Sequence, residues 1–416
     1  MICYIAYPTS LTLQSANALQ TYTTLRELRA RRPDTLAIIP RWGREPSRFS
    51  ELGALHLPRP AIGKLSRLHR STLLYYLEHT AFAFMTAAII ARQRHKVEAV
   101  YVRQVVCAAW WAGLFGPRLS LPVIYEAHDL ETRNPSRAKE LWATGLLHLL
   151  DKLAITRSTR LVSLTAAFRD YLAAIGWRSP VEVAVIPDAY DERLFAPQDR
   201  AASRAALGLP LDRTIIAYAG MTFAHRWLDG LLEAASRLAP THPNLLLLLV
   251  GGREGERAAL RAKAEELGMT MDDRLSSTAH RPPPTVPSLI LVPPRPQAEV
   301  VRYLAAADVL AVPDTVTDMT ASPLKLFEYL ALGTPLVLPE LPALFEIVPP
   351  AMAHSFPRRN LEGLVQALAE AIAARSDTAA AVARRALATG HTYARRAERI
   401  IAVVEEIRSE KAELRM

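Results

Sequence analysis

Short apolar runs alternate with longer amphipathic segments along the whole chain, and this alternation limits the fold more than any other feature of the sequence. In the first half, apolar runs are found at 1–7, 36–40, 97–102, 122–125, 160–164 and 181–186. The pattern is interrupted around 187–198, and apolar runs then return at 214–219, 245–250, 288–292, 309–312 and 336–338. Strands that alternate with helices are typical of a parallel sheet with helices on both faces. The sequence therefore predicts an α/β protein built from two Rossmann-like, doubly wound units.

The length of the chain agrees with two units. At 416 residues it exceeds one typical hydrophobic core. We expect a first domain at 1–195, a second at 196–390, and a charged helix at 391–416 that could pack back on the first domain. Ligands bind outside the carboxyl ends of the strands in such sheets, so two facing units would leave a binding cleft between them.

The segment 320–348 contains the clearest candidate site. Lys325 and Glu328 lie one helical turn apart, after Ser322 as a predicted N-cap and Pro323 as the first helical residue. Gly333 is expected to end this helix. The start of a helix attracts anions, Lys325 adds a full positive charge, and Glu328 can accept hydrogen bonds from a sugar diol. The alternative is an ordinary amphipathic helix with a solvated Lys–Glu pair.

Two further segments carry polar residues at the ends of predicted strands. Gly220 closes one strand, and Arg226 follows it where a guanidinium could pair with a phosphate. A solvated arginine in a strand–turn–helix connection is the alternative. His128 follows the strand at 122–125, on the side where ligands bind in parallel sheets. A structural histidine that is capped by Asp129 is equally compatible with this pattern.

These segments resemble glycosyltransferase family 4. Its donor signature has a glutamate, seven residues and a second glutamate before A-x-G-x-P-V/I-V. Glu328 stands at the second glutamate and Thr320 replaces the first. The residues that match the rest of this signature are Tyr329, Ala331, Gly333, Pro335 and Val337.

Three other family patterns are present in the same order along the chain. In the pattern Y-x-G-x-x-x-x-x-K-G-x-D-x-L-L-x-A, Arg226 replaces the lysine that holds the donor diphosphate, and Trp227 replaces the glycine. The segment 125–129 resembles Y-E-x-H-D, whose histidine lies near the reacting sugar. The segment 186–195 resembles I-P-N-G-V-D-x-x-x-F, with Asp188 for asparagine and Ala189 for glycine, and is expected to be a hinge.

The resemblance implies a GT-B fold, with two facing Rossmann-like domains and an interdomain cleft. The N-terminal domain would lie on the acceptor side and the C-terminal domain would bind the donor. The implied activity is that of a retaining, metal-independent hexosyltransferase. It would move a sugar from a UDP- or GDP-linked donor to a glycan or lipid-linked acceptor in cell-envelope or exopolysaccharide synthesis. The nucleotide-diphosphate-sugar is a co-substrate, and no other cofactor is expected.

The resemblance also assigns roles to single residues. His128, Arg226 and Lys325 would be catalytic, and Ser15 and Asn17 would lie on the acceptor side. No metal ligand is expected. The donor-binding residues would be Gly220, Arg226, Arg295, Thr320, Ser322, Lys325 and Glu328.

Three other functions stay open at this point. Nucleotide-sugar epimerases share the fold and act on the donor itself. A catalytically degenerate homologue could bind a nucleotide-sugar or act as a scaffold, because Thr320 stands where a glutamate normally contacts the sugar. A net charge of +9 would also suit nucleic acid, but the chain has no zinc spacing or basic helix with interleaved aromatics, so no nucleic-acid partner is expected.

Charge and hydropathy bear on the location of the protein. The chain has two widely separated cysteines, which suit a reducing compartment, and its start has no basic leader. We expect a cytoplasmic protein with no apolar run of the roughly 20 residues that a membrane span requires. Arg59, Lys64, Arg67 and Arg70 precede an apolar segment at 81–91, which Arg92, Arg94 and Lys96 follow. This arrangement suggests peripheral contact with the anionic inner face of the plasma membrane, although a buried core helix is the alternative.

Overall fold

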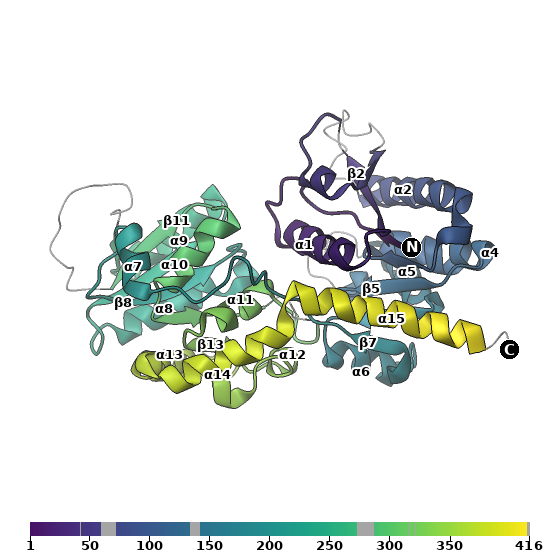
Figure 1. Ribbon diagram of the computed structural model, residues 1–416. Coiled ribbons are helices and arrows are strands. Elements are labelled where there is room, and N and C mark those ends of the chain that lie inside the picture. The colour runs from purple at the N-terminus through teal and green to yellow at the C-terminus, as the bar shows by residue number, and fades with distance from the viewer. Residues whose placement is uncertain are drawn as a thin grey trace. The chain divides into compact units, whose positions relative to one another are not determined.

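The computed structural model describes residues 1–41, 43–59, 72–133, 142–272, 287–315, 317–320 and 322–413. The chain forms two compact units (Figure 1). The first unit comprises Met1–Asp188 together with Tyr393–Met416, and the second comprises Ala189–Thr392. The sequence analysis set its divisions at 195 and 390. By packing, the C-terminal helix therefore belongs with the N-terminal residues.

The first unit contains a seven-stranded parallel sheet with the order β3-β2-β1-β4-β5-β6-β7. Its strands are β1 (Ile2–Ile5), β2 (Leu36–Arg41), β3 (Leu55–Pro58), β4 (Ala99–Val102), β5 (Val123–Ala127), β6 (Arg160–Ser163) and β7 (Val183–Val185). Every residue of β1, β4 and β5 is buried. This burial explains why the central strands are continuous apolar runs, since both faces of a doubly wound sheet are covered.

Helices cover both faces of the first sheet. The helices α2 (Thr72–Arg92), α3 (Val105–Trp110), α5 (Thr144–Arg157) and α6 (Ala166–Ala174) pack on one face, with the short α4 (Gly116–Leu119) after α3. The opposite face is covered by α1 (Ala16–Arg31) and by α15 (Tyr393–Glu413). Ile400 and Val404 of α15 share a buried cluster with Leu25 and Leu28 of α1. The C-terminal helix is therefore part of the core of the first unit (Figure 1).

Helix α2 is longer than the apolar segment that the sequence analysis identified. From Leu74 to Arg92 it is long and apolar enough to cross a membrane by length and composition alone, contrary to the prediction that no run reaches this length. The predicted apolar segment is too short because Glu78 and His79 interrupt the apolar pattern. Both of these side chains are buried. Nearly half of the apolar window, 44%, is buried inside the protein. The core helix of a soluble protein passes the same test, so the observation is weak evidence for a membrane span.

The second unit repeats the architecture with a seven-stranded parallel sheet of the order β10-β11-β9-β8-β12-β13-β14. Its strands are β8 (Thr214–Ala219), β9 (Leu245–Val250), β10 (Thr270–Met271), β11 (Ser288–Val292), β12 (Val309–Ala311), β13 (Leu336–Pro339) and β14 (His354–Phe356). The α/β prediction with two doubly wound parallel sheets is therefore confirmed. The sequence analysis did not predict β3, β10 or β14.

The helices of the second unit also form two layers. One face of the sheet is covered by α10 (Gln297–Ala305), α11 (Leu324–Leu332) and α12 (Pro342–Phe345), with α7 (Arg200–Ala206) and α14 (Thr378–Ala388) beside them. The other face is covered by α8 (Leu228–Leu238), α9 (Glu254–Glu266) and α13 (Leu361–Ala373). This arrangement places the starts of α8 and α11 at the carboxyl edge of the sheet, where ligands bind in such folds.

Candidate functional site

The helix that carries Lys325 and Glu328 begins at Leu324, one residue later than the sequence predicted. Pro323 occupies the N-cap position with φ −73° and ψ 128°, and its own side chain makes no capping hydrogen bond. The prediction that Ser322 is the N-cap and Pro323 the first helical residue is therefore wrong. The extended ψ of Pro323 delays helical dihedral angles until the next residue. Gly333 ends the helix in the left-handed conformation with φ 75°, as predicted.

Lys325 lies against the end of β8. Its Nζ is 3.6 Å from the centroid of the Tyr218 ring, where the ammonium faces the electron-rich side of the ring. Gly220 has φ 137°, and a Cβ at this position would come within 2.8 Å of Lys325 Nζ. The backbone conformation therefore favours glycine here, and a larger residue would have to displace the end of the lysine side chain. Burial, together with the charge of Arg226, lowers the pKa of Lys325 well below its ordinary value.

Glu328 is buried on the same helix. Its Oε1 accepts a hydrogen bond of 2.7 Å from Nε2 of Gln297, the first residue of α10. Burial raises the pKa of Glu328 to about 7, although the Gln297 hydrogen bond and Lys325 oppose this shift. A carboxyl group with this pKa is partly protonated near neutral pH. Hydroxyl donors from a sugar would stabilise its charged form.

Arg226 ends the short turn Ala224–Arg226 that follows β8. Its Nε is buried and has no hydrogen-bond partner among the described residues, and the same holds for Nε2 of His225. Within the described parts of the chain, neither Arg226 nor Lys325 forms an ion pair with a carboxylate. Since these two cations repel each other, an anion bound between them would relieve the repulsion. This pair is the strongest sign of an anion site at the carboxyl edge of the second sheet.

Trp227 stands where the family pattern has a glycine, and its backbone has a conformation that favours glycine. The residue lies in the left-handed region with φ 52°. Its ring packs on Gly230, where a Cβ would come within 2.2 Å of the indole. The missing side chain at Gly230 therefore provides the space for the indole, which also lies 6.2 Å from the ring of Phe356 between centroids.

Thr320 and Arg295 make contacts of other kinds. The hydroxyl of Thr320 is hydrogen-bonded to that of Thr317, and the Thr320 N–H donates to the Thr317 hydroxyl at 3.2 Å. Arg295 lies before α10 with its Nε 4.0 Å from Oε2 of Glu299, and 42% of its side chain is exposed. Among the described residues, the structure shows no contact of Arg295 with Lys325 or Glu328.

The sequence analysis missed a cationic cluster beside Arg226. Asp314, which is fully buried after β12, accepts hydrogen bonds from Nε of Arg358 at 2.7 Å and Nε of Arg359 at 2.8 Å. The pKa of His225 is lowered by burial and by Arg226, while Asp314 opposes the shift and Arg359 adds to it. Arg226, Asp314 and Arg359 therefore all influence His225 electrostatically. Because Arg358 and Arg359 follow β14, far along the chain from β12, spacing in the sequence gave no signal for this cluster.

In the first unit, His128 follows β5 and 31% of its side chain is exposed. Its Nε2 lies 2.8 Å from Oε1 of Glu126 and 3.1 Å from Nη2 of Arg103. The nitrogen can donate to the carboxylate when protonated or accept from the guanidinium when it is not. Asp129 instead accepts a hydrogen bond from the N–H of Leu130. The contacts that orient His128 are therefore with Glu126 and Arg103.

Glu126 is the centre of a buried polar network that the sequence analysis also missed. Arg103 Nε donates to its Oε1 at 2.9 Å, and Nη2 of Arg396 on α15 lies 2.7 Å from its Oε2. Burial alone would raise the pKa of Glu126, but Arg103 and Arg396 hold it well below its ordinary value. Arg103 also donates to Gln20 and Thr21 on α1. Hydrogen bonds and ion pairs thereby connect α1 and α15, on one face of the sheet, to Glu126, which contacts His128.

Ser15 and Asn17 organise the loop before α1. Ser15 caps the helix by accepting a hydrogen bond of 3.2 Å from the N–H of Ala18, and its hydroxyl lies 2.6 Å from that of Thr9. Asn17 Oδ1 accepts from the N–H of Thr9 at 3.2 Å. Both residues have structural roles in this loop, and their predicted contact with an acceptor stays a prediction.

Comparison with protein families identifies the class to which this chain belongs. Residues 18–189 match the glycosyl transferase 4-like domain, and residues 212–374 match the glycosyl transferases group 1. The chain belongs to the group 1 glycosyltransferases, which confirms the resemblance seen in its motifs.

Among curated proteins, the chain is 29% identical over 278 residues to D-inositol 3-phosphate glycosyltransferase of Mycobacterium sp. (strain KMS). The match covers 63% of this chain and 56% of that relative, so the chain spans little more than half the length of this relative. A protein of the same name from Mycolicibacterium paratuberculosis is 26% identical over 330 residues, which cover 77% of this chain and 69% of the relative.

Solved structures share the fold. Sucrose-phosphate synthase from Thermosynechococcus elongatus has a TM-score of 0.69 at 18% identity, covering 99% of this chain and 97% of that one. HepE from Anabaena in complex with UDP has a TM-score of 0.69 at 16% identity, covering 97% and 99%. WaaG, a glycosyltransferase involved in lipopolysaccharide biosynthesis, has a TM-score of 0.66 at 16% identity, also covering 97% and 99%. These neighbours establish the GT-B architecture of the chain.

Proposed function

We propose that the protein is a retaining glycosyltransferase that moves a sugar from a nucleotide-diphosphate-sugar to a glycan or lipid-linked acceptor. The observation that carries this proposal is the pair of cations at the carboxyl edge of the second sheet. Arg226 and Lys325 have no carboxylate partner among the described residues, and they neighbour the buried Glu328. A diphosphate would satisfy the two cations, and a ribose diol would supply donors to the carboxylate.

The chemistry follows from these charges. Departure of the sugar leaves negative charge on the diphosphate oxygens, and fixed cations aimed at those oxygens lower the barrier. Arg226 and Lys325 would supply this stabilisation. The role of His128 is to contact the transferred sugar, with its ring held by Glu126 and Arg103. Since HepE was solved with UDP and with UDP-glucose, UDP-linked donors are the first to test.

Ligand-induced thermal shifts with UDP, GDP, ADP and their common sugars test the donor site. We expect Lys325→Ala and Glu328→Ala each to abolish the nucleotide-dependent shift while leaving the protein folded. The matched controls are Lys263→Ala and Glu266→Ala, which change the same residue types in a surface ion pair on α9 and should leave the shift unchanged. A normal shift in both site variants would refute the assignment.

Product analysis distinguishes the alternative functions. Release of nucleoside diphosphate that depends on an added acceptor supports glycosyl transfer. Conversion of the donor sugar without such release would identify an epimerase. Binding without either reaction would identify a non-catalytic homologue, which is the outcome that Thr320 makes most important to check.

We also propose that the protein is cytoplasmic and contacts an anionic membrane through the α2 side of the first unit. Leu77 and Phe84 of α2 are about half exposed, at 53% and 47%, and Arg92, Arg94 and Lys96 at its end are exposed. Apolar side chains beside basic ones favour binding to anionic lipid surfaces. Lys64, Arg67 and Arg70, which belong to the same hypothesis, lie outside the described residues.

Flotation with vesicles that contain anionic lipid tests this contact. Phe84→Asp should reduce the floated fraction severalfold, because a charge replaces an apolar side chain at the contact surface. Leu211→Asp is the control, since Leu211 is 64% exposed in the second unit. Equal flotation of the two variants, or no flotation of the unmodified protein, would contradict the proposal.

A further inference from the structure

A charged groove lies at the amino-terminal edge of the second sheet. It has a volume of about 680 Å³ and lies beside the residues that precede β8, β12 and β13. Gly220 follows the opposite end of β8, and six strand residues separate the two edges by about 20 Å. The groove is therefore distinct from the donor site. Its charged lining consists of Asp199, Arg200, Arg204, Asp212, Arg213, Asp308, Arg375, Asp377, Arg384 and Arg385.

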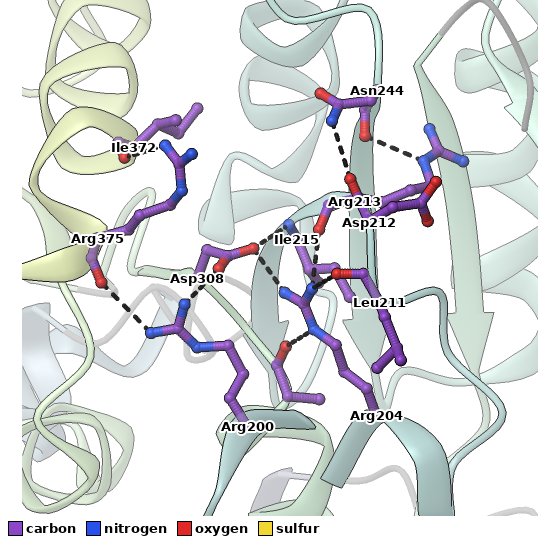
Figure 2. A network of polar contacts seen from close by, with 11 residues as sticks. Arg200, Arg204, Leu211, Asp212, Arg213, Ile215, Asn244, Asp308, Ile372 and Arg375 are labelled. Atoms are coloured by element: carbon purple, nitrogen blue, oxygen red, sulfur yellow. Dashed lines mark hydrogen bonds and ion pairs between the residues drawn. The ribbon is translucent and has the colours of Figure 1, made fainter. Parts of the chain in front are cut away.

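One wall of the groove is a rigid polar network (Figure 2). Asp308 accepts hydrogen bonds of 2.6 Å from Arg200 and from Arg204, and one of 2.8 Å from the Ile215 N–H. Arg204 also donates to backbone oxygens, including Ala306 at 2.8 Å and Leu211 at 3.0 Å. The charge of Asp308 is therefore already matched. This carboxylate does not neutralise the other arginines of the groove.

Arg384 and Arg385 also line the groove, and neither forms an ion pair with any described residue. Arg384 is buried, with 4% exposure, and its Nε donates to the Gly333 oxygen at 3.0 Å. Its other nitrogens have no hydrogen bond or ion pair within the described residues, although they belong to a side chain that lines the groove. Arg385 is partly exposed and forms neither type of contact with any described residue. Burial lowers the pKa of Arg384, Asp377 opposes this shift and Arg385 adds to it.

The bond to Gly333 explains only part of this arrangement. It places a cation at the carboxyl end of α11, which the helix dipole favours. One N–H of Arg384 is enough for that role, however, and a guanidinium has five. Two arginines with unused donors line the same groove, and guanidinium groups bind phosphate through paired hydrogen bonds.

We infer that this groove is a second anion site, which binds a phosphate dianion through Arg384 and Arg385. The same chemistry is offered by inorganic phosphate and by the phosphate of a small monoester. The site is independent of the proposed donor site, because it uses different residues at the opposite edge of the sheet.

Isothermal titration with inorganic phosphate at constant ionic strength tests this inference. Phosphate could also bind at the donor site, so every titration uses the full chain with Arg226→Gln and Lys325→Ala. In this background we expect saturable binding, and a loss of affinity of about tenfold or more on adding Arg384→Gln or Arg385→Gln. Arg408→Gln removes an equal charge from an exposed position of α15 and should leave the affinity unchanged.

The possible results separate clearly. No saturable binding in the background protein, or an equal loss in the Arg408→Gln control, would overturn the inference. Circular dichroism checks the fold, and if Arg384→Gln unfolds, Arg385→Gln decides alone, because the Arg385 side chain makes no hydrogen bond to any described residue. Titration with glycerol 3-phosphate then identifies the source: tighter binding than inorganic phosphate indicates a monoester, and weaker or equal binding indicates free phosphate.

Discussion

The buried carboxyl group of Glu328 should make donor binding depend on pH. Its pKa is raised to about 7 by burial, and the role proposed for it requires the charged carboxylate to accept hydrogen bonds from a ribose diol. A protonated carboxyl group must shed its proton before it can accept both bonds. The affinity for the donor should therefore rise as the pH rises through 7. Glu328→Gln, which has the same shape and does not titrate, should remove this dependence.

The size of the effect follows from the pKa. A carboxyl group with a pKa of about 7 is about one-tenth charged at pH 6 and about nine-tenths charged at pH 8. If only the charged form binds, the affinity should increase about tenfold over this interval, which corresponds to about 1.4 kcal/mol. Lys325 would act in the opposite direction, because its lowered pKa favours loss of its proton at higher pH. The slope that remains in Glu328→Gln measures this contribution.

Titration calorimetry at pH 6, 7 and 8 provides the measurement. UDP-glucose is a more suitable ligand than UDP for this pH series, because its sugar-substituted phosphate has no ionisation near neutral pH. Burial and the charge of Arg226 lower the pKa of His225, which favours the neutral ring. An affinity of the unmodified protein that is flat or falls between pH 6 and 8, with Glu328→Gln showing the same profile, would refute the role of the carboxylate.

Five substitutions, in three sets, test the packing that positions the sites. Asp308→Asn leaves the buried Arg204 without its charge partner. It should lower the free energy of unfolding by about 3–5 kcal/mol and the melting temperature by roughly 10 °C. Arg200→Gln, at the partly exposed end of the same network, should lower the free energy of unfolding by less than about 1 kcal/mol. Gly230→Ala should lower the free energy of unfolding by about 1–3 kcal/mol, because the added methyl group overpacks against the indole. Adding Trp227→Ala should recover this lost stability. Gly220→Ala displaces Lys325 and should weaken nucleotide binding at least about tenfold in calorimetry; unchanged binding would show that the lysine is not held there.

The central strands of both sheets and the edge strand β7 could be predicted from the sequence, but the other three edge strands could not. The expected strands at 214–219, 245–250 and 288–292 agree with β8, β9 and β11 to the residue. The three strands that were missed, β3, β10 and β14, are edge strands. An edge strand pairs on one side only and is partly exposed, so it needs no continuous apolar run. The signal used to find strands is therefore weakest at the edges.

The candidate site divides in a similar way. Residues within one motif, such as Lys325 and Glu328, could be identified because helical periodicity places them one turn apart. Their partners could not, since Gln297 reaches Glu328 from another helix, and Arg396 reaches Glu126 from the opposite end of the chain. These contacts depend on how β-strands far apart in sequence become neighbours. Local spacing carries no information about that order.

The Trp227 position shows how a departure from a family pattern should be interpreted. A bulky residue in the left-handed conformation argues against the motif if the position is considered alone, because glycine normally avoids that strain. The structure places the indole over Gly230, one turn later, where a side chain would block it. Trp227 and Gly230 therefore form one packing unit, in which the glycine in the helix makes room for the large side chain in the turn. Arg226, directly before Trp227, keeps its place beside Lys325, so the change alters how the turn packs and leaves the charge pair of the proposed donor site intact.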